Sequence, residues 1–199
     1  MGEKALSNYS FDAYLALEAE SETKYEFHDG MITAMAGGTP EHGQIAMNFG
    51  RGVGNSIVEK GKTCIVYSSD VKVHIASSKR IFYPDASIVC EKPVKSDTDP
   101  HAITNPILIV EVLSESTAMF DLGEKFAHYR DIPSLREYVI ISQTQPTVHT
   151  YYRTDNGTWE ITTISKLSDT VVLKSIGCEV SMADIYLQVP GIEEKEDII

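Results

Sequence analysis

The stretch PILIVEVLSEST, residues 106–117, predicts the central strand of the fold and raises the question of a site. Its core, residues 107–113, is apolar except for Glu111, which stands between two valines. A short continuous apolar run is typical of a strand that is buried on both faces. Burial of even a neutral polar group without partners costs about 2–7 kcal/mol. Glu111 therefore needs a basic partner, several hydrogen bonds or a metal ion.

The segments on either side of this strand alternate between helix and strand patterns. Ser10 and Thr39 stand where helix N-caps are expected, with Pro40 at a first helical position, and Ser116 or Thr117 caps a third helix. Helices are expected over residues 10–21, 39–62, 116–132 and 181–187. Strands are expected over residues 24–35, 64–68, 70–75, 80–91, 107–113, 136–142, 147–153, 158–164 and 171–175, with a polar loop at 92–105. The first of these segments is a hairpin that turns at Asp29-Gly30, and 147–153 with 158–164 form another around Asn156-Gly157. We predict an α/β fold of the α+β type, with a mixed β-sheet flanked by helices. A single domain is expected over residues 1–190, followed by an acidic, frayed tail at 191–199.

The charge of the chain is uneven. The net charge of −12 argues against a broad nucleic-acid-binding surface, because such surfaces are normally basic. Residues 51–95, however, carry eight bases against four acids. A basic face on an acidic body is therefore one interpretation of the sequence.

Hydropathy and cysteine content suggest a location. No window approaches the roughly 18 apolar residues that a membrane span needs, and residues 1–10 lack the apolar core of a signal peptide. Cys64, Cys90 and Cys178 are far apart and odd in number, so neither a disulfide framework nor a zinc site is indicated. We expect a reduced, cytoplasmic protein with no membrane partner.

A second carboxylate and a lysine are placed to join Glu111. Asp85 lies in the apolar strand segment YPDASIVC, and two nearby carboxylates repel unless a cation lies between them. Oxygen ligands suit a hard cation such as Mg²⁺. Asp121, Lys125 and His128 recur at helical spacing, so they share one face of the helix that follows Glu111. A helix that returns over the sheet would bring Lys125 toward Glu111, where it could stabilise charge on a phosphate.

These residues resemble the Uma-two family of restriction-type endonucleases, within the PD-(D/E)XK nuclease superfamily. The resemblance covers roughly residues 10–155, and its most specific part is the EVLSxST segment with a DxxxK helix behind it. The matching positions are Tyr25-Glu26, Asp29-Gly30, His42, Tyr83-Pro84-Asp85, residues 106–117, Asp121, Lys125, Tyr129-Arg130 and Glu137-Tyr138.

The resemblance implies a restriction-endonuclease-like domain that hydrolyses DNA phosphodiester bonds with a metal-activated water as nucleophile. Asp85 and Glu111 would bind Mg²⁺ or Mn²⁺ with help from the Val112 carbonyl. Lys125 would be the catalytic lysine, and Glu26 would match the extra acidic residue of many such nucleases. The partners implied are a DNA substrate and a second copy of the chain in a homodimer. The sequence departs from the E-x-K pattern of the superfamily, because Leu113 stands where lysine is expected.

Several structural interpretations compete with this one. Glu111 could be paired with Lys125 or Arg130 for structural reasons only. Asp85 could be a turn cap, and Asp121 with Lys125 could be an ordinary helix pair. Glu26 could be an exposed strand acid, and no role follows for His42 or His128. The alternative function is an inactive nuclease-like fold that binds nucleic acid or protein, which the missing lysine and the acidic charge favour; a metal-independent partner module has no motif in its support.

Overall fold

The computed structural model describes residues 5–35, 37–114 and 120–192. Helices begin and end close to the predicted bounds, at α1 (Phe11–Glu20), α2 (Pro40–Glu59), the π-helix η1 (Asp121–Lys125), α4 (Phe126–Tyr129) and α5 (Met182–Ile185). The strands are β1 (Ala5–Leu6), β2 (Tyr25–His28), β3 (Met31–Ala34), β4 (Ile65–Ser68), β5 (Lys72–Ile75), β6 (Arg80–Phe82), β7 (Ala86–Val89), β8 (Ala102–Ile103), β9 (Leu108–Leu113), β10 (Glu137–Ser142), β11 (Val148–Arg153), β12 (Trp159–Ile164), β13 (Thr170–Leu173) and β14 (Cys178–Ser181).

The strands form two six-stranded sheets and one hairpin. The first sheet has the order β1-β3-β2-β6-β5-β8, and the second has the order β12-β11-β10-β9-β7-β4. In the second sheet β9 lies between parallel β10 and antiparallel β7, which confirms that it is a central strand. Strands β13 and β14 pair only with each other. The α+β fold with mixed sheets and flanking helices is confirmed, but the expected single sheet is divided.

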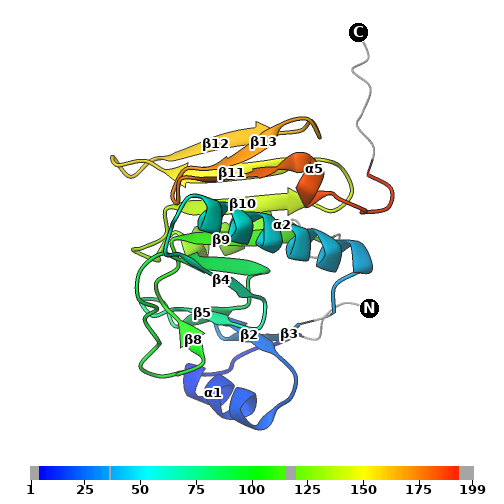
Figure 1. Cartoon of the computed structure of the whole chain (residues 1–199). Helices are drawn as coiled ribbons and strands as arrows, with labels where there is room; N and C mark the ends of the chain where they lie inside the picture. The colour runs from blue at the N-terminus through cyan, green and yellow to red at the C-terminus, as the bar shows by residue number, and fades with distance from the viewer. Residues whose placement is uncertain (1–4, 36, 115–119, 193–199) are drawn as a thin grey trace.

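The layers follow from the alternation of side chains along β9. Val110 and Val112 belong to a core that also contains residues of α2, β13, β14 and α5. Figure 1 shows α2 lying along the second sheet. Ile109 faces the opposite way, into a second core between the two sheets. A third core, around Tyr14, lies between the first sheet and α1. Glu111 has the same parity as Ile109, so the strand turns its carboxylate toward the space between the sheets.

Local sequence signals explain the best-predicted elements. Ser10 accepts a hydrogen bond from Ala13 N at the start of α1, and Thr39 accepts one from His42 N at the start of α2. Asp29 and Gly30 have φ angles of 49° and 79°, as a two-residue hairpin turn requires. The predicted caps Ser116 and Thr117 lie outside the described residues.

The sequence suggested one strand over residues 80–91, but the structure divides this segment. The chain forms β6 in the first sheet, breaks at Tyr83-Pro84-Asp85, and continues as β7 in the second sheet. Proline lacks the backbone N–H that strand pairing needs, so the pairing with the first sheet stops there and the chain can enter the second sheet. The break matters for the site because it places Asp85 where the two sheets meet. Three short strands, β1, β8 within the expected loop and β14, were not predicted.

The prediction of unpaired cysteines is wrong. Cys64 and Cys90 form a disulfide, and only Cys178 is free. Strands β4 and β7 pair antiparallel with Ile65 opposite Val89, so the next positions outward bring the two cysteines together. A sequence separation of 26 residues does not reveal that register.

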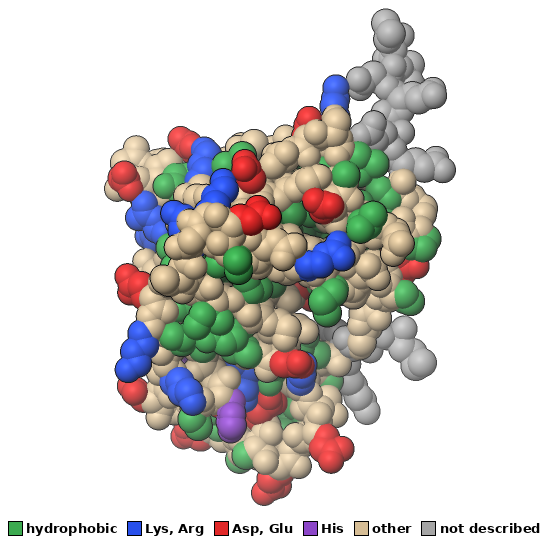
Figure 2. Space-filling view, viewed as in Figure 1, with side chains coloured by type: hydrophobic (Ala, Val, Ile, Leu, Met, Phe, Trp, Pro, Cys, Tyr) green, Lys and Arg blue, Asp and Glu red, His purple; other side chains and the backbone are tan. Residues whose placement is uncertain are grey.

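Surface charges are more mixed than the sequence implied. Three of the eight bases in residues 51–95 pair with acids from elsewhere: Lys60 with Glu179, Lys72 with Asp99 and Glu18, and Arg80 with Asp29 and Asp131. On the face shown in Figure 2, basic and acidic side chains are interspersed. The ion pairs therefore divide the expected basic face. Among the described residues, no helix has the length and apolarity needed to cross a membrane.

Candidate active site

Glu111 is paired with Lys125. The Lys125 Nζ atom lies 2.9 Å from Glu111 Oε1, and both side chains are buried. The Tyr129 hydroxyl donates a second hydrogen bond to the same oxygen at 2.9 Å. Of the two basic partners considered for Glu111, the structure thus places Lys125 beside it.

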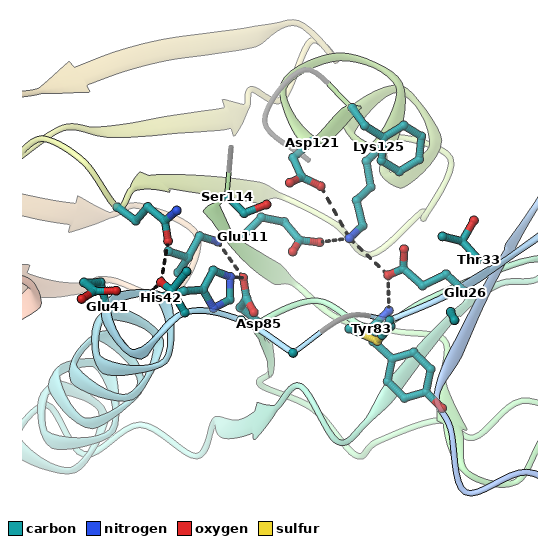
Figure 3. Close-up of a pocket in the computed structure, with 18 of the residues that line it drawn as sticks. Glu26, Thr33, Glu41, His42, Tyr83, Asp85, Glu111, Ser114, Asp121 and Lys125 are labelled. Atoms are coloured by element: carbon teal, nitrogen blue, oxygen red, sulfur yellow. Dashed lines mark hydrogen bonds and ion pairs between the residues drawn. The ribbon is translucent and has the colours of Figure 1, made fainter. Parts of the chain in front are cut away.

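Lys125 also contacts carboxylates from two other directions. Its Nζ lies 3.2 Å from Glu26 Oε1 and 3.6 Å from Asp121 Oδ1. Glu26 comes from β2 and is fixed by the Tyr83 backbone N–H, which donates to Oε1 at 2.9 Å. Figure 3 shows Glu111, Asp121 and Glu26 arranged around this one ammonium group. Glu26 is therefore part of the cluster and not an exposed strand acid.

A π-helical turn carries the lysine. Residues 121–125 form η1, in which the backbone is wider than in an α-helix. The Tyr138 hydroxyl donates to the Asp121 carbonyl at 3.0 Å, and Phe126 stacks on the Tyr138 ring. These contacts fix the turn on β10, beside β9. The spacing of Asp121 and Lys125 predicted an ordinary helix pair, and their contact is retained in the π-helix.

Asp85 lies beside the cluster and contacts His42. Since Ala86 pairs with Val110 in the antiparallel register, the next position places Asp85 opposite Glu111. Asp85 Oδ2 accepts a hydrogen bond from Val112 N at 2.7 Å and lies 3.2 Å from His42 Nε2. His42 also makes a hydrogen bond to the Val112 backbone. The histidine thus contacts both Asp85 and Val112, two of the three predicted metal ligands.

All of the predicted site residues line one cavity of about 970 Å³. Glu26, Asp85, Glu111, Val112 and Lys125 share it with Asp121 and His42. A second cavity of about 890 Å³ meets it at Asp85 and His42 and continues along α2. The two cavities form a continuous depression past the carboxylates.

Comparison with known proteins places the chain in a family. Residues 11–184 match the Uma2 family, described as "Putative restriction endonuclease". The chain belongs to this family.

Two relatives from Synechocystis and one solved structure are similar to this chain. "Uncharacterized protein slr1290" of Synechocystis sp. is 35% identical over 175 residues, which cover 88% of this chain and 90% of that protein. "Uncharacterized protein sll1609" of the same organism is 37% identical over 149 residues, with 75% and 83% covered. A crystal structure of "a putative nuclease belonging to DUF820" from Anabaena variabilis superposes with a TM-score of 0.72 at 15% identity, covering 89% and 97% of the two chains. At that identity it confirms the fold.

The electrostatics of this Uma2 site are dominated by burial and by excess negative charge. Burial raises the pKa of the Glu111 carboxyl well above its usual range; Lys125 opposes this effect, while Asp121, Asp85 and Glu26 add to it. Burial alone would lower the pKa of Lys125, but Glu111, Glu26 and Asp121 outweigh it and raise the pKa well above the ordinary value. Lys125 is therefore charged. One ammonium faces several carboxylates, and a cation would relieve their repulsion.

His42 is the main residue of the Uma2 site to which the sequence gave no role. A hydrogen bond to Asp85 raises the pKa of His42, against the lowering effect of burial, and the Asp85 charge adds to the rise. His42 thus places an imidazole N–H donor beside the Asp85 carboxylate. His42 is among the residues that carry the family resemblance, and its place in the first turn of α2 was the available signal. Tyr129 likewise received no role, although Tyr129-Arg130 is among the positions that carry the family resemblance.

Proposed function

We propose that the protein is a metal-dependent endonuclease that hydrolyses phosphodiester bonds of DNA. The observation that carries the proposal is the buried Glu111–Lys125 pair, with Glu26, Asp121 and Asp85 around it in one open cavity. A purely structural ion pair needs neither three further carboxylates nor access to solvent. Family membership supports a nuclease-type function for the same cavity.

The donor atoms fit a hard divalent cation. Asp85, Glu111 and the Val112 carbonyl offer only oxygen, and Mg²⁺ or Mn²⁺ is bound through one or two carboxylates together with waters. When bound, the ion would supply Lewis-acid polarisation of the phosphodiester and a more acidic water nucleophile. These three residues would hold it.

The remaining residues have roles that follow from their contacts. Lys125 keeps a fixed positive charge beside Glu111, where charge develops on a phosphate during attack. Glu26 and Tyr129 orient that pair, one through Lys125 and the other through Glu111. Asp121 anchors the helical turn that presents the ammonium.

The depression along α2 is the proposed path for the nucleic acid strand. It is lined by glycines at 43 and 50, which let a backbone approach, and by Arg51 and Lys24, which suit phosphate groups. Because the protein is acidic overall, binding should be weak and should fall steeply with salt. A homodimer and a cytoplasmic location belong to the same proposal.

Plasmid nicking tests this function. Wild-type protein and the variants Glu111→Gln and Lys125→Met are each incubated with supercoiled DNA and Mg²⁺, Mn²⁺ or EDTA. The control variant is Lys60→Ala, because Lys60 pairs with Glu179 at the exposed surface. We expect nicking that requires metal, a loss of about 10²-fold or more in both site variants, and full activity in the control. Circular dichroism of each variant excludes unfolding as the cause. Equal nicking by all proteins, or none by wild type with any divalent ion, would overturn the proposal; DNA binding without nicking would favour the inactive binding module.

A further inference from the structure

A second group of potential metal ligands lies beside Phe82, whose ring stacks with His28 and His128 and also has Lys125 Nζ over it. His28 ends β2, Asp29 begins the hairpin turn, and His128 lies in α4. One ligand atom from each residue lies within 4.8 Å of the other two. His128 Nε2 is 3.6 Å from Asp29 Oδ2. Two ligands at about 2.1 Å from a tetrahedral ion are about 3.4 Å apart, so the distance between His128 and Asp29 suits such an ion.

The two imidazoles carry nitrogen atoms that the described protein atoms do not satisfy. His28 Nδ1 and His128 Nε2 are buried and have no hydrogen-bond partner in the part of the chain that the structure describes. His28 is only 7% exposed. Buried polar atoms are nearly always paired, because leaving one unsatisfied is costly. A bound metal ion would give such a nitrogen a partner.

We propose that His28, Asp29 and His128 bind a transition-metal ion, with Zn²⁺ as the best match. Two imidazoles and one carboxylate form a donor set that suits Zn²⁺, Co²⁺ or Ni²⁺, whereas Mg²⁺ prefers oxygen. Three protein ligands leave a fourth position open for water or another ligand. This site differs in ligands and in metal class from the one proposed at Asp85 and Glu111, and it does not depend on nuclease activity.

The surroundings hold the three residues in the states that a metal requires. Burial lowers the pKa of His28 and of His128, and the Arg80 charge lowers the pKa of His128 further, so both rings are neutral at pH 7. Burial raises the pKa of Asp29 but is outweighed by Arg80, which keeps the carboxylate ionised. Arg80 Nη2 donates to Asp29 Oδ1 at 2.6 Å, which leaves Oδ2 toward His128. Such outer contacts orient the ligands of protein metal sites.

An ion at this site would connect the two elements that carry Glu26 and Lys125. His28 lies two residues after Glu26 on β2, and His128 lies three residues after Lys125 on the helix. An ion bound to both would clamp the β2–β3 hairpin to the helix. It would thereby fix the approach of Glu26 to Lys125, which is 3.2 Å here.

Metal binding to purified protein tests the site without any nuclease assay. Protein stripped with EDTA and dialysed is titrated with Co²⁺, followed by visible absorption, and then with Zn²⁺ as competitor. We expect one Co²⁺ per chain with strong absorption bands, displaced by Zn²⁺. His128→Ala should weaken binding by more than about 100-fold and Asp29→Asn by at least about 10-fold, as the loss of a ligand requires. Asp29→Asn keeps the turn, since asparagine tolerates its positive φ of 49°.

Two control variants separate this site from others. His149→Ala removes a half-buried histidine on β11 that is held by Thr163, and Glu111→Gln removes the proposed Mg²⁺ ligand. Both should bind Co²⁺ as wild type does. The proposal is overturned if wild type binds no Co²⁺ or Zn²⁺, or if His128→Ala binds as tightly as wild type. It is also overturned if Glu111→Gln abolishes binding, which would place the ion at the carboxylate cluster. Since nicking is not measured, failure here leaves the endonuclease proposal standing.

Discussion

Lys125 Nζ lies 2.9 Å from Glu111 Oε1, although the two residues come from different elements. The π-helical turn at Asp121–Lys125 makes the contact, because it follows β9 in the chain and is held by Tyr138. The ammonium group that pairs with Glu111 thus comes from the helical turn and not from β9 itself. The pair is buried, so removing one partner should cost about 3–5 kcal/mol.

Tyr129→Phe should weaken both stability and activity. Its hydroxyl donates to Glu111 at 2.9 Å in a fully buried position, and loss of such a bond costs about 1–2 kcal/mol. We expect nicking to fall by about tenfold, because a misoriented Glu111 raises the barrier by about 1.4 kcal/mol. Tyr14→Phe is the matched control, since it removes a part-buried hydroxyl bond to the Tyr25 carbonyl and neither residue lines the cavity. Urea unfolding and nicking rates check both variants, and an equal loss of nicking in the two would refute a specific role for Tyr129.

Acidification should destabilise the protein through His74. This ring is buried against Phe11, and burial lowers the pKa of His74, with a weaker opposing effect from Asp99. A histidine whose folded pKa is depressed contributes stability that is present above its unfolded pKa of about 6.5 and is lost as the pH falls through the folded value. The melting temperature of wild type should drop between about pH 7 and 5, and His74→Phe should flatten that drop. The control is His101→Ala, which changes an exposed histidine and should keep the wild-type pH profile. A wild-type pH profile in His74→Phe would contradict the assignment to His74.

Two glycines of α2 should respond oppositely to alanine. A Cβ at Gly52 would lie 2.6 Å from Val180 Cγ1, so Gly52→Ala forces α2 away from β14 and should cost about 1–3 kcal/mol. A Cβ at Gly54 meets no atom within 4 Å. Gly54→Ala should therefore stabilise the helix by about 0.5–1 kcal/mol. Denaturant midpoints measure both, and a gain at Gly52 would show that α2 packs differently.

Reduction should destabilise the chain through Cys64 and Cys90. Opening a disulfide typically costs about 2–4 kcal/mol, which corresponds to a melting temperature lower by roughly 5–15 °C in a chain of this size. The double variant Cys64→Ser, Cys90→Ser should melt like the reduced protein and ignore reductant, whereas Cys178→Ser should remain sensitive. Identical melting of wild type with and without reductant would mean that the two thiols are not paired. That outcome would agree with the reducing cytoplasm expected from the sequence.

The hydrophobic periodicity of the sequence, with its cap and turn residues, was enough to predict most helices and strands. Ser10, Thr39 and the Asp29-Gly30 turn act within a few residues of the backbone groups they satisfy, so their signals are local. The apolar run around Glu111 likewise needs no distant information to indicate a central strand. Pro84 indicated an edge, a bend or a strand start within residues 80–91, but it could not show that the two halves join different sheets. Which sheet a strand joins depends on partners far away in the chain.

The sequence by itself determined that Asp85, Glu111 and Lys125 stand out, since carboxylates in apolar strands and a lysine on the next helix are unusual; Glu26 entered only through the family resemblance. Only the tertiary structure decided that Lys125 pairs with Glu111 and Glu26, that His42 contacts Asp85, and that Cys64 meets Cys90. It also brought His28 and His128 together from a strand and a helix. The physical reason is that charge and thiol contacts depend on strand register and on how the two sheets and α2 pack, which no local pattern encodes.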